Sequence, residues 1–354
     1  MGHADKTTVK MKKKDTLELK SHATKTIPHQ LLWLKRFHIS IFKTKTHQEA
    51  RLMRKISWLK VVALAVLFLL PLAATTPAQA ARSIDPVVST DWLQKNLDNK
   101  DLVIVDLRKL EEYKEGHIPG SINVFYGSWA VKKGALLNEL PEADDLEDVI
   151  SEAGIDENSL VVLVDKVEKV PDQFGMTRVA WTLKYAGVTN VAVLSGGLTQ
   201  WIKEGKSLSK DVTNPKNKEF EANWNENLFV DKATVAAKLG KAIILDNRAP
   251  AFYEGKEKME FVAKTGRIKG ALNLPVGQLF TPEGLYKDKA TLAELAEKAT
   301  GGDKDKEYIV YCDTGKTCTS WAFILTDLLG YKDVKVYDGS SMEWLADPNA
   351  PAEP

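Results

Sequence analysis

The stretch YIVYCDTGKTCTSW, residues 308–321, indicates what kind of fold this chain adopts. Its first four residues are apolar and favour a buried strand. The strand leads directly into a polar loop that starts at Cys312 and contains Gly315, and an apolar stretch of helical period then continues to Leu329. A strand that passes through a short loop into a helix is the building unit of α/β proteins, which bind ligands where the strands end.

Similar apolar runs lie along the chain on both sides of this stretch, and amphipathic segments of helical period separate them. Short β-rich runs that alternate with helical segments indicate βαβ units around a mostly parallel sheet. The predicted strands are residues 102–105, 160–164 and 191–194 in one half, and 243–245, 308–311 and 334–337 in the other.

The two halves repeat each other in three blocks that keep their spacing. The first block matches at an offset of 140, the second at 150 because the second half has an insertion of ten residues, and the third at 143. Three blocks in register indicate the duplication of a unit of about 140 residues. The matched pairs are Asp106, Arg108 and Tyr113 with Asp246, Arg248 and Tyr253; Gly116, Ile118, Gly120 and Asn123 with Gly266, Ile268, Gly270 and Asn273; and Gly187, Val191, Gly196 and Trp201 with Gly330, Val334, Gly339 and Trp344.

These blocks resemble the rhodanese superfamily, specifically its tandem-domain sulfurtransferases. The markers are DLR at 106–108, GHIPGSIN at 116–123 and LSGG at 194–197, with DNR at 246–248, GRIKGA at 266–271 and YDG at 337–339 in the second half. The resemblance implies an α/β fold with two tandem rhodanese-like domains, each a mostly parallel sheet flanked by helices. We expect these domains at residues 84–205 and 228–348, a linker at 206–227 and a short tail at 349–354.

Residues 53–80 have the order of a secretory signal peptide. Two basic residues precede an apolar run at 61–70, and the segment ends in Ala-Gln-Ala at 78–80. Cleavage after Ala80 predicts a periplasmic or secreted protein without stable membrane insertion, and an uncleaved anchor is the alternative. Residues 1–52 are a basic N-terminal extension, which is either a translated cytoplasmic segment or a mis-assigned gene start.

Basic residues are concentrated in front of the predicted cleavage site. Residues 1–80 contain 15 Lys and Arg but 4 Asp and Glu, although the whole chain has 49 and 48. The rest of the chain is therefore acidic, which argues against a nucleic-acid partner because phosphate binding rewards clustered cations. Two cysteines in 354 residues also exclude a disulfide-stapled scaffold.

Cys312 is the candidate nucleophile. A free thiol with a pKa near 8.5 is only about 3% thiolate at pH 7, so a reactive cysteine needs a lowered pKa. The only histidine after residue 80, His117, belongs to the first half. The loop amides, the positive end of the following helix and Lys316 are the groups available to lower the pKa. The alternative is that Cys312 is a small buried apolar residue.

The resemblance favours catalysis, because the Cys-x-x-Gly-x-Thr loop corresponds to the six-residue active loop of sulfurtransferases. It implies that Cys312 carries the sulfur and that five loop residues bind the substrate: Asp313, Thr314, Gly315, Lys316 and Thr317. Neither a metal nor an organic cofactor is implied.

Two other loop motifs fit the residues after the predicted strand less well. A nucleotide-binding loop would need glycine where Val310 stands, and a rhodanese-like phosphatase would need arginine where Cys318 stands. A third possibility stays open, in which Cys318 is a redox partner that forms a disulfide with Cys312 in an oxidising compartment.

The resemblance also assigns roles outside the loop. Asp165 stands where Cys312 stands in the second half, so the first domain is expected to have lost its nucleophile. Arg178 corresponds to an arginine of the first domain that lines the site, and Arg248 to one that can hold an anionic substrate. Their alternatives are a surface charge at a helix start for Arg178, and capping and ion pairing with Asp246 for Arg248.

The sequence therefore predicts an exported sulfurtransferase that moves sulfur from a small-molecule donor to a thiol or cyanide acceptor through a Cys312 persulfide. Thiosulfate-preferring relatives usually have a basic residue after the cysteine and mercaptopyruvate-preferring ones a small residue, so Asp313 leaves the donor open. An acid at this position also supports an alternative of a different class, which is a catalytically weak persulfide-binding or partner-docking module.

Overall fold

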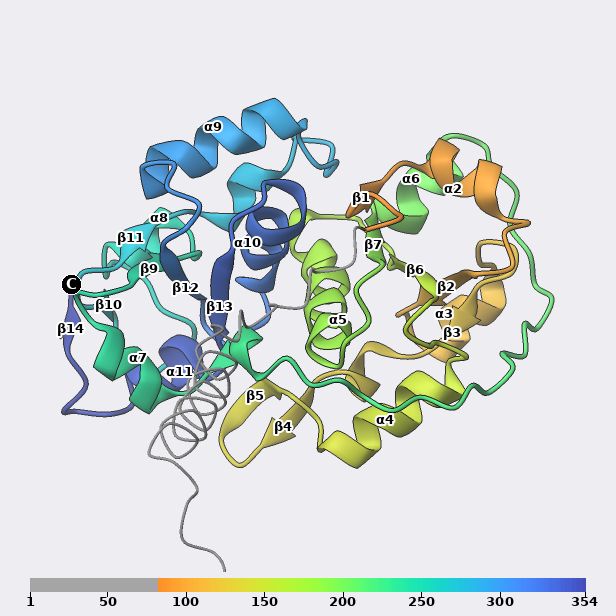
Figure 1. The fold of residues 1–354 in the computed structure, drawn as a ribbon. Coiled ribbons are helices and arrows are strands. Elements are labelled where there is room, and N and C mark those ends of the chain that lie inside the picture. Colours follow the sequence, from red (N-terminus) through yellow and green to blue (C-terminus); the bar gives the residue numbers. More distant parts are fainter. Residues whose placement is uncertain (1–81) are drawn as a thin grey trace, which may run out of the picture. The chain divides into compact units, whose positions relative to one another are not determined.

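The structure is a computed structural model that describes residues 82–354 (Figure 1). The predicted N-terminal extension at residues 1–52 and the predicted signal peptide at 53–80 lie outside the described residues. Across residues 82–354, no helix is long and apolar enough to cross a membrane.

The first domain is built on a five-stranded parallel sheet with the strand order β1-β7-β6-β2-β3. The three predicted strands are confirmed as β2, β6 and β7, and β2 extends to Asp106. The strands are β1 (Val87–Val88), β2 (Leu102–Asp106), β3 (Ile122–Asn123), β6 (Leu160–Val164) and β7 (Val191–Leu194). The helices are α2 (Thr90–Asn96), α3 (Leu110–Glu115), α4 (Ala143–Glu152), α5 (Phe174–Tyr185) and α6 (Gly197–Lys203).

The second domain repeats this arrangement. Its parallel sheet has the order β8-β13-β12-β9-β11, so each strand takes the place of its repeat partner. The strands are β8 (Phe229–Val230), β9 (Ile243–Asp246), β11 (Leu272–Asn273), β12 (Glu307–Tyr311) and β13 (Asp333–Tyr337). The helices are α7 (Lys232–Lys238), α8 (Pro250–Tyr253), α9 (Lys289–Thr300), α10 (Thr319–Phe323) and α11 (Ser340–Trp344). The expectation of two tandem α/β domains is therefore confirmed.

Two small antiparallel pairs complete the structure. A hairpin of β4 (Val131–Lys133) and β5 (Leu136–Glu139) belongs to the first domain, and β10 (Arg267–Ile268) pairs with β14 (Ala352–Glu353) in the second. The segment at 206–225 contains no helix or strand, and Ser209 forms an isolated bridge with His117. His117 also contacts the carbonyl oxygens of Tyr113 and Asp211 through its ring nitrogens, so it has a structural role.

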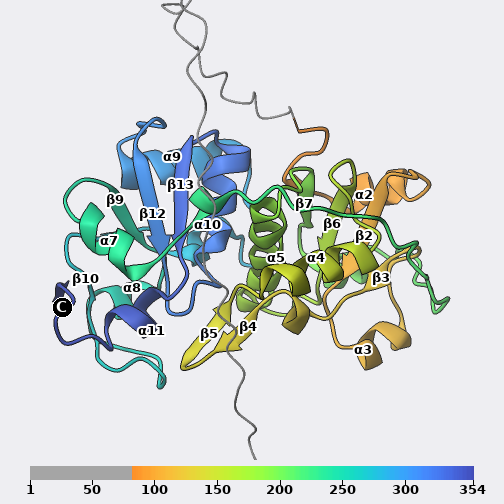
Figure 2. The ribbon, with the colours of Figure 1, turned by 60° about the horizontal axis from the view of Figure 1, so that its bottom comes forward.

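The two sheets share a core because the strands alternate their side chains between two faces. In β12, Tyr308 and Val310 face a cluster that contains residues of both domains, whereas Ile309 and Tyr311 face a cluster of the second domain alone. Helices α5 and α10 lie side by side in the shared region (Figures 1 and 2). The hydroxyl groups of Thr177 and Ser320 join these helices at 2.8 Å.

Candidate active site

Cys312 lies where strand alternation and chain direction place it. It follows β12 directly and is on the same face as Tyr308 and Val310, so its side chain belongs to the core shared by the two domains. Only 1% of the residue is exposed. Asp165 follows β6, the repeat partner of β12, and lies on the same strand face as Leu163, which belongs to the shared core. The residues that follow the two central strands are thus both on the strand face that packs into the core shared by the two domains.

The thiol of Cys312 is surrounded by hydrogen-bond donors. Burial by itself would raise the pKa of this thiol. Hydrogen bonds from the Cys318 thiol and from the backbone N–H groups of Thr314, Thr317 and Cys318 outweigh burial and lower the pKa of Cys312 to about 6. These amides are donors of the kind expected from the sequence, and they favour an anionic sulfur at neutral pH.

The loop needs glycine at position 315 and holds its curvature through Ser340. Gly315 has a φ of +69°, and a Cβ at this position would lie 2.6 Å from the carbonyl oxygen of Asp338. The hydroxyl of Ser340 accepts hydrogen bonds from the N–H of Cys312 at 3.2 Å and from that of Gly315 at 3.0 Å. Ser340 itself has a φ of +48°, a strained conformation that places its hydroxyl under the loop.

Arg178 of helix α5 is buried against the loop that begins at Cys312. Its guanidinium forms a two-point ion pair with Asp338 and donates a hydrogen bond of 3.1 Å to the carbonyl oxygen of Gly315. The guanidinium also lies 5.1 Å from the ring centre of Phe229. The predicted arginine of the first domain therefore reaches the site, and the contacts that the structure shows hold the loop. Its Nε–H has no hydrogen-bond partner within residues 82–354.

Lys316 lies between residues of the first domain. Its ammonium is 4.2 Å from the ring centre of Tyr126, a distance that favours a cation–π contact. Burial lowers the pKa of Lys316, whereas the nearby carboxylate of Asp165 acts in the opposite direction. Burial also raises the pKa of Asp165 to about 7. Asp165, the repeat counterpart of Cys312, is thus an acid whose charge acts on the lysine of the loop.

A chain of hydrogen bonds connects the hairpin of the first domain to the loop. The hydroxyl of Tyr126 donates to the amide oxygen of Asn138 at 2.8 Å, and the amide nitrogen of Asn138 donates to the hydroxyl oxygen of Thr314 at 2.9 Å. Asn138 has a φ of +61°, which turns its side chain out of the β5 strand. Because Thr314 accepts from Asn138, its own O–H is directed elsewhere.

Asp313 is paired with the second predicted arginine. Arg248 binds both carboxylate oxygens of Asp246 and the carbonyl of Gly266, as Arg108 does with Asp106 and Gly116 in the first domain. Arg248 additionally lies 3.7 Å from a carboxylate oxygen of Asp313. Burial raises the pKa of Asp313 to about 7, although the charge of Arg248 opposes this shift.

The structure brings most of the predicted site residues together around one sulfur. Arg248 reaches the group only through Asp313. Within residues 82–354, no cluster of three or more His, Cys, Asp or Glu side chains could hold a metal ion. Four residues of the site were not found from the sequence: Tyr126, Asn138, Asp338 and Ser340. At the repeat offset of 143, Ser340 stands where the first domain has Gly197, and Asp338 where it has Ser195. Positions at which the two repeats differ therefore indicate these two site residues.

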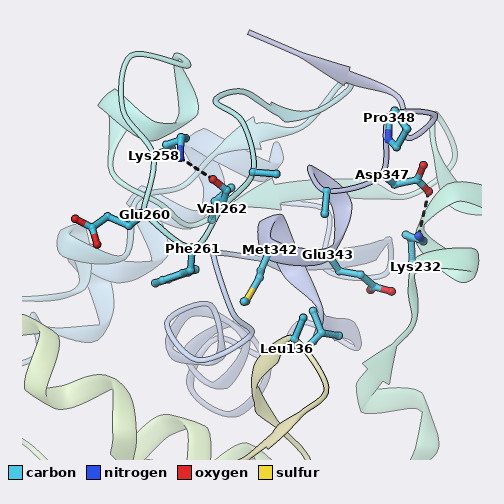
Figure 3. A pocket seen from close by; sticks show the side chains of 13 residues that line it. Leu136, Lys232, Lys258, Glu260, Phe261, Val262, Met342, Glu343, Asp347 and Pro348 are labelled. Atoms are coloured by element: carbon cyan, nitrogen blue, oxygen red, sulfur yellow. Dashed lines mark hydrogen bonds and ion pairs between the residues drawn. The ribbon is translucent and has the colours of Figure 1, made fainter.

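A cavity of about 670 Å³ lies beside the loop, between the tip of the β4–β5 hairpin and the segment inserted in the second domain. In Figure 3, Met342 lies between Phe261 of that segment and Leu136 of the hairpin. The N–H of Met342 donates to the carbonyl oxygen of Asp313 at 3.0 Å. The cavity therefore adjoins the outer side of the catalytic loop.

The chain has recognisable relatives over both domains. The profile of the rhodanese-like domain matches residues 89–204 and 231–347, and each match contains the central strands of one sheet. The chain is 32% identical over 312 residues to a Synechococcus elongatus protein named as a thiosulfate sulfurtransferase, covering 85% of this chain and 95% of the relative. It is 28% identical over 274 residues to the sulfur carrier protein TtuD of Thermus thermophilus, covering 73% of this chain and 93% of the relative.

A solved structure has the same architecture. The chain resembles the 3-mercaptopyruvate sulfotransferase SseA of Escherichia coli with a TM-score of 0.63 and 27% sequence identity. This similarity covers 73% of this chain and 99% of SseA.

Proposed function

Because the chain belongs to the rhodanese-like family, we propose that it is a sulfurtransferase that carries sulfur as a persulfide on Cys312. In the first step, the Cys312 thiolate attacks the outer sulfur of a donor such as thiosulfate, and sulfite leaves with the electron pair of the broken bond. In the second step, a thiol or cyanide attacks the outer sulfur of the persulfide, and the Cys312 thiolate leaves. No metal or organic cofactor takes part in either step.

The observation that carries this proposal is the ring of donors around Cys312. Three backbone N–H groups and the Cys318 thiol converge on the sulfur and lower its pKa to about 6. The same donors would stabilise the anion of a persulfide attached there, because they are fixed by the loop before the reaction. A cysteine that was only a buried apolar residue would need no such ring.

Lys316 is the cation that we assign to the anionic end of the donor. Its ammonium contacts the face of Tyr126, and no carboxylate among the described residues lies within 4.0 Å of it, so it can accept an anion. Arg178 and Arg248 are engaged with Asp338 and Asp246, and we propose that they mainly hold the loop and compensate Asp313. Arg248 offsets the negative charge of Asp313, so Asp313 repels an anionic donor less than an unpaired acid would.

Thiosulfate and 3-mercaptopyruvate are both candidate donors, in keeping with the names of the relatives. The test is to incubate the protein with each donor, remove the donor, and measure the mass of the Cys312 peptide without reductant. We expect a gain of about 32 Da, one sulfur, with at least one donor, and formation of thiocyanate when cyanide is added. The Cys312→Ser variant should show neither. A folded protein that gains no sulfur from either donor would contradict the proposal.

A carrier role is the second candidate, because one relative is named a sulfur carrier protein. A carrier would take up sulfur at Cys312 as above but transfer it slowly to cyanide. Fast loading combined with slow cyanolysis would favour the carrier, whereas fast turnover with cyanide would favour the enzyme.

We also propose that the protein is exported after cleavage behind Ala80. Arg82 would then be the second residue of the mature chain, and its guanidinium binds the carbonyl of Thr189 at 2.9 Å and the carboxylate of Asp327 at 3.2 Å. The mature N-terminus would thus contribute to contacts between the two domains. N-terminal sequencing of exported protein should find Ala81 first, and retention of residues 1–52 would contradict this proposal.

A further inference from the structure

The second cysteine of the chain lies in contact with the first. Cys318 and Cys312 are the only two cysteines among 354 residues, and both are free buried thiols in the same core cluster. Cys318 directly precedes helix α10, at the far end of the loop that Cys312 begins. Hydrogen bonds from its S–H and its backbone N–H to the Cys312 sulfur are among the causes that lower the pKa of Cys312. The loop therefore begins and ends with two free buried thiols that belong to the same core cluster.

We propose that Cys318 is a resolving thiol that discharges the Cys312 persulfide as hydrosulfide and leaves a Cys312–Cys318 disulfide. The proposal rests on the sulfurtransferase function proposed above, because that reaction supplies the persulfide. It adds a second outcome for the bound sulfur, which is reduction inside the protein instead of transfer to an external acceptor.

The step balances without an external oxidant. The Cys318 sulfur attacks the inner sulfur of the persulfide, a bond forms between the two cysteine sulfurs, and the bond to the outer sulfur breaks. The outer sulfur leaves with the electron pair of the broken bond. When the persulfide is anionic, this sulfur leaves as a dianion, takes up the proton of the Cys318 thiol and becomes hydrosulfide. The two cysteine sulfurs are oxidised to a disulfide, and the sulfane sulfur is reduced to sulfide.

The surroundings of Cys318 keep its thiol protonated while Cys312 is a thiolate that carries no sulfur. Burial raises the pKa of Cys318 well above its ordinary value, and the hydrogen bond to Cys312 and the charge of the Cys312 thiolate raise it further. In the persulfide, the negative charge resides mainly on the outer sulfur, one bond farther from Cys318. The repulsion that keeps Cys318 protonated then becomes weaker, while the buried Arg178 continues to favour its thiolate.

The burial of both sulfurs favours an internal partner over a large external one. Cys318 is 0% exposed and Cys312 is 1% exposed. Once the disulfide has formed, the nucleophile is blocked until a dithiol reductant reopens the bond by thiol–disulfide exchange. The loop would thus link sulfur transfer to the supply of such a reductant.

The experiment compares the wild-type protein with the Cys318→Ser variant, which keeps a hydroxyl donor but removes the second sulfur. Both proteins are reduced, desalted and kept anaerobic, so that only the sulfane sulfur can oxidise the cysteines. Each is then loaded with thiosulfate, or with inorganic polysulfide, which delivers sulfur without recognition of a donor. Intact mass and free sulfide are followed over time, and Cys312→Ser serves as the control without a sulfur-carrying thiol.

We expect both proteins to gain about 32 Da, and because Cys318 is one of the donors around Cys312, each is loaded to completion so that the comparison concerns the fate of the added sulfur and not the loading rate. The wild-type protein should then fall to about 2 Da below its reduced mass and release one equivalent of sulfide, while Cys318→Ser keeps the added sulfur. A wild-type persulfide that survives as long as that of Cys318→Ser would overturn the proposal. Polysulfide separates the resolving role of Cys318 from the proposed donor. If thiosulfate loads neither protein but polysulfide produces the disulfide in the wild type and not in Cys318→Ser, the donor assignment is wrong and the resolving role stands.

Discussion

The reactivity of Cys312 should follow a titration with a midpoint near pH 6. The donors around its sulfur lower the pKa of Cys312 to about 6, and a thiol with this pKa is about 90% thiolate at pH 7. An unperturbed cysteine would be about 3% thiolate at the same pH. The perturbed loop thus increases the thiolate population about thirtyfold at neutral pH.

One of these donors can be removed by a single substitution. Cys318→Ala deletes the S–H group that donates to the Cys312 sulfur and leaves the backbone amides in place. A hydrogen bond to a charged group stabilises that group by about 1.5 kcal/mol, and a weak S–H donor contributes slightly less. This stabilisation of the thiolate corresponds to a shift of about one pKa unit. We therefore expect the midpoint to rise by about one unit in Cys318→Ala. Cys318→Ser is the matched control, since its hydroxyl can replace the donor.

The assay is the rate of alkylation by iodoacetamide, measured by mass spectrometry of the Cys312 peptide from about pH 5 to pH 9. Cys318 should stay unmodified in this range, because burial raises the pKa of its thiol well above the ordinary value. A wild-type midpoint near 8.5 would refute the argument that the loop amides stabilise the thiolate. An unchanged midpoint in folded Cys318→Ala would refute the contribution of the thiol donor.

Four further predictions concern stability and the interface. The pKa of Cys312 is lower in the folded chain than the value near 8.5 expected for an unfolded one, so its thiolate stabilises the fold fully above that value and this stabilisation is lost as the pH falls through about 6. In urea unfolding, the free energy of unfolding of the wild type should therefore fall by about 1 to 1.5 kcal/mol relative to that of Cys312→Ser between pH 7 and pH 5. Gly315→Ala should abolish sulfur uptake and cost about 1 to 3 kcal/mol of stability, since its Cβ would collide with Asp338, and full activity would contradict the loop geometry. Asn138→Gly should lower kcat/KM about tenfold with little change in melting temperature, because it removes the hydrogen bond to Thr314 of the loop and the one to Tyr126 while glycine tolerates the φ of +61°, and unchanged kinetics would exclude a role for the hairpin. Arg178→Ala should destabilise the protein by about 3 to 5 kcal/mol by leaving Asp338 without its partner, whereas a raised KM with unchanged stability would instead support direct donor binding.

The sequence by itself determined the features that depend on neighbouring residues. The apolar runs predicted all six central strands, because a buried strand needs only a short run of β-forming residues in succession. The spacing of the repeated blocks showed the duplication, and equivalent residues do occupy equivalent places, as the Arg108 and Arg248 ion pairs demonstrate. The position of Cys312 at the end of a central strand was also readable, since the strand and the loop are contiguous.

Only the tertiary structure decided which distant side chains meet at that sulfur. Asn138 contacts Thr314 across 176 residues, and Arg178 contacts Asp338 across 160. Sequence reasoning placed Arg178 at the site but not its partners, and it left Asp313 as an unpaired acid although Arg248 lies 3.7 Å away. Local patterns report which face of a strand or helix is buried, whereas a hydrogen bond or ion pair between two domains depends on how those faces are packed together. The catalytic loop is therefore predictable from its own residues, and the shell that orients it exists only once both domains have folded against each other.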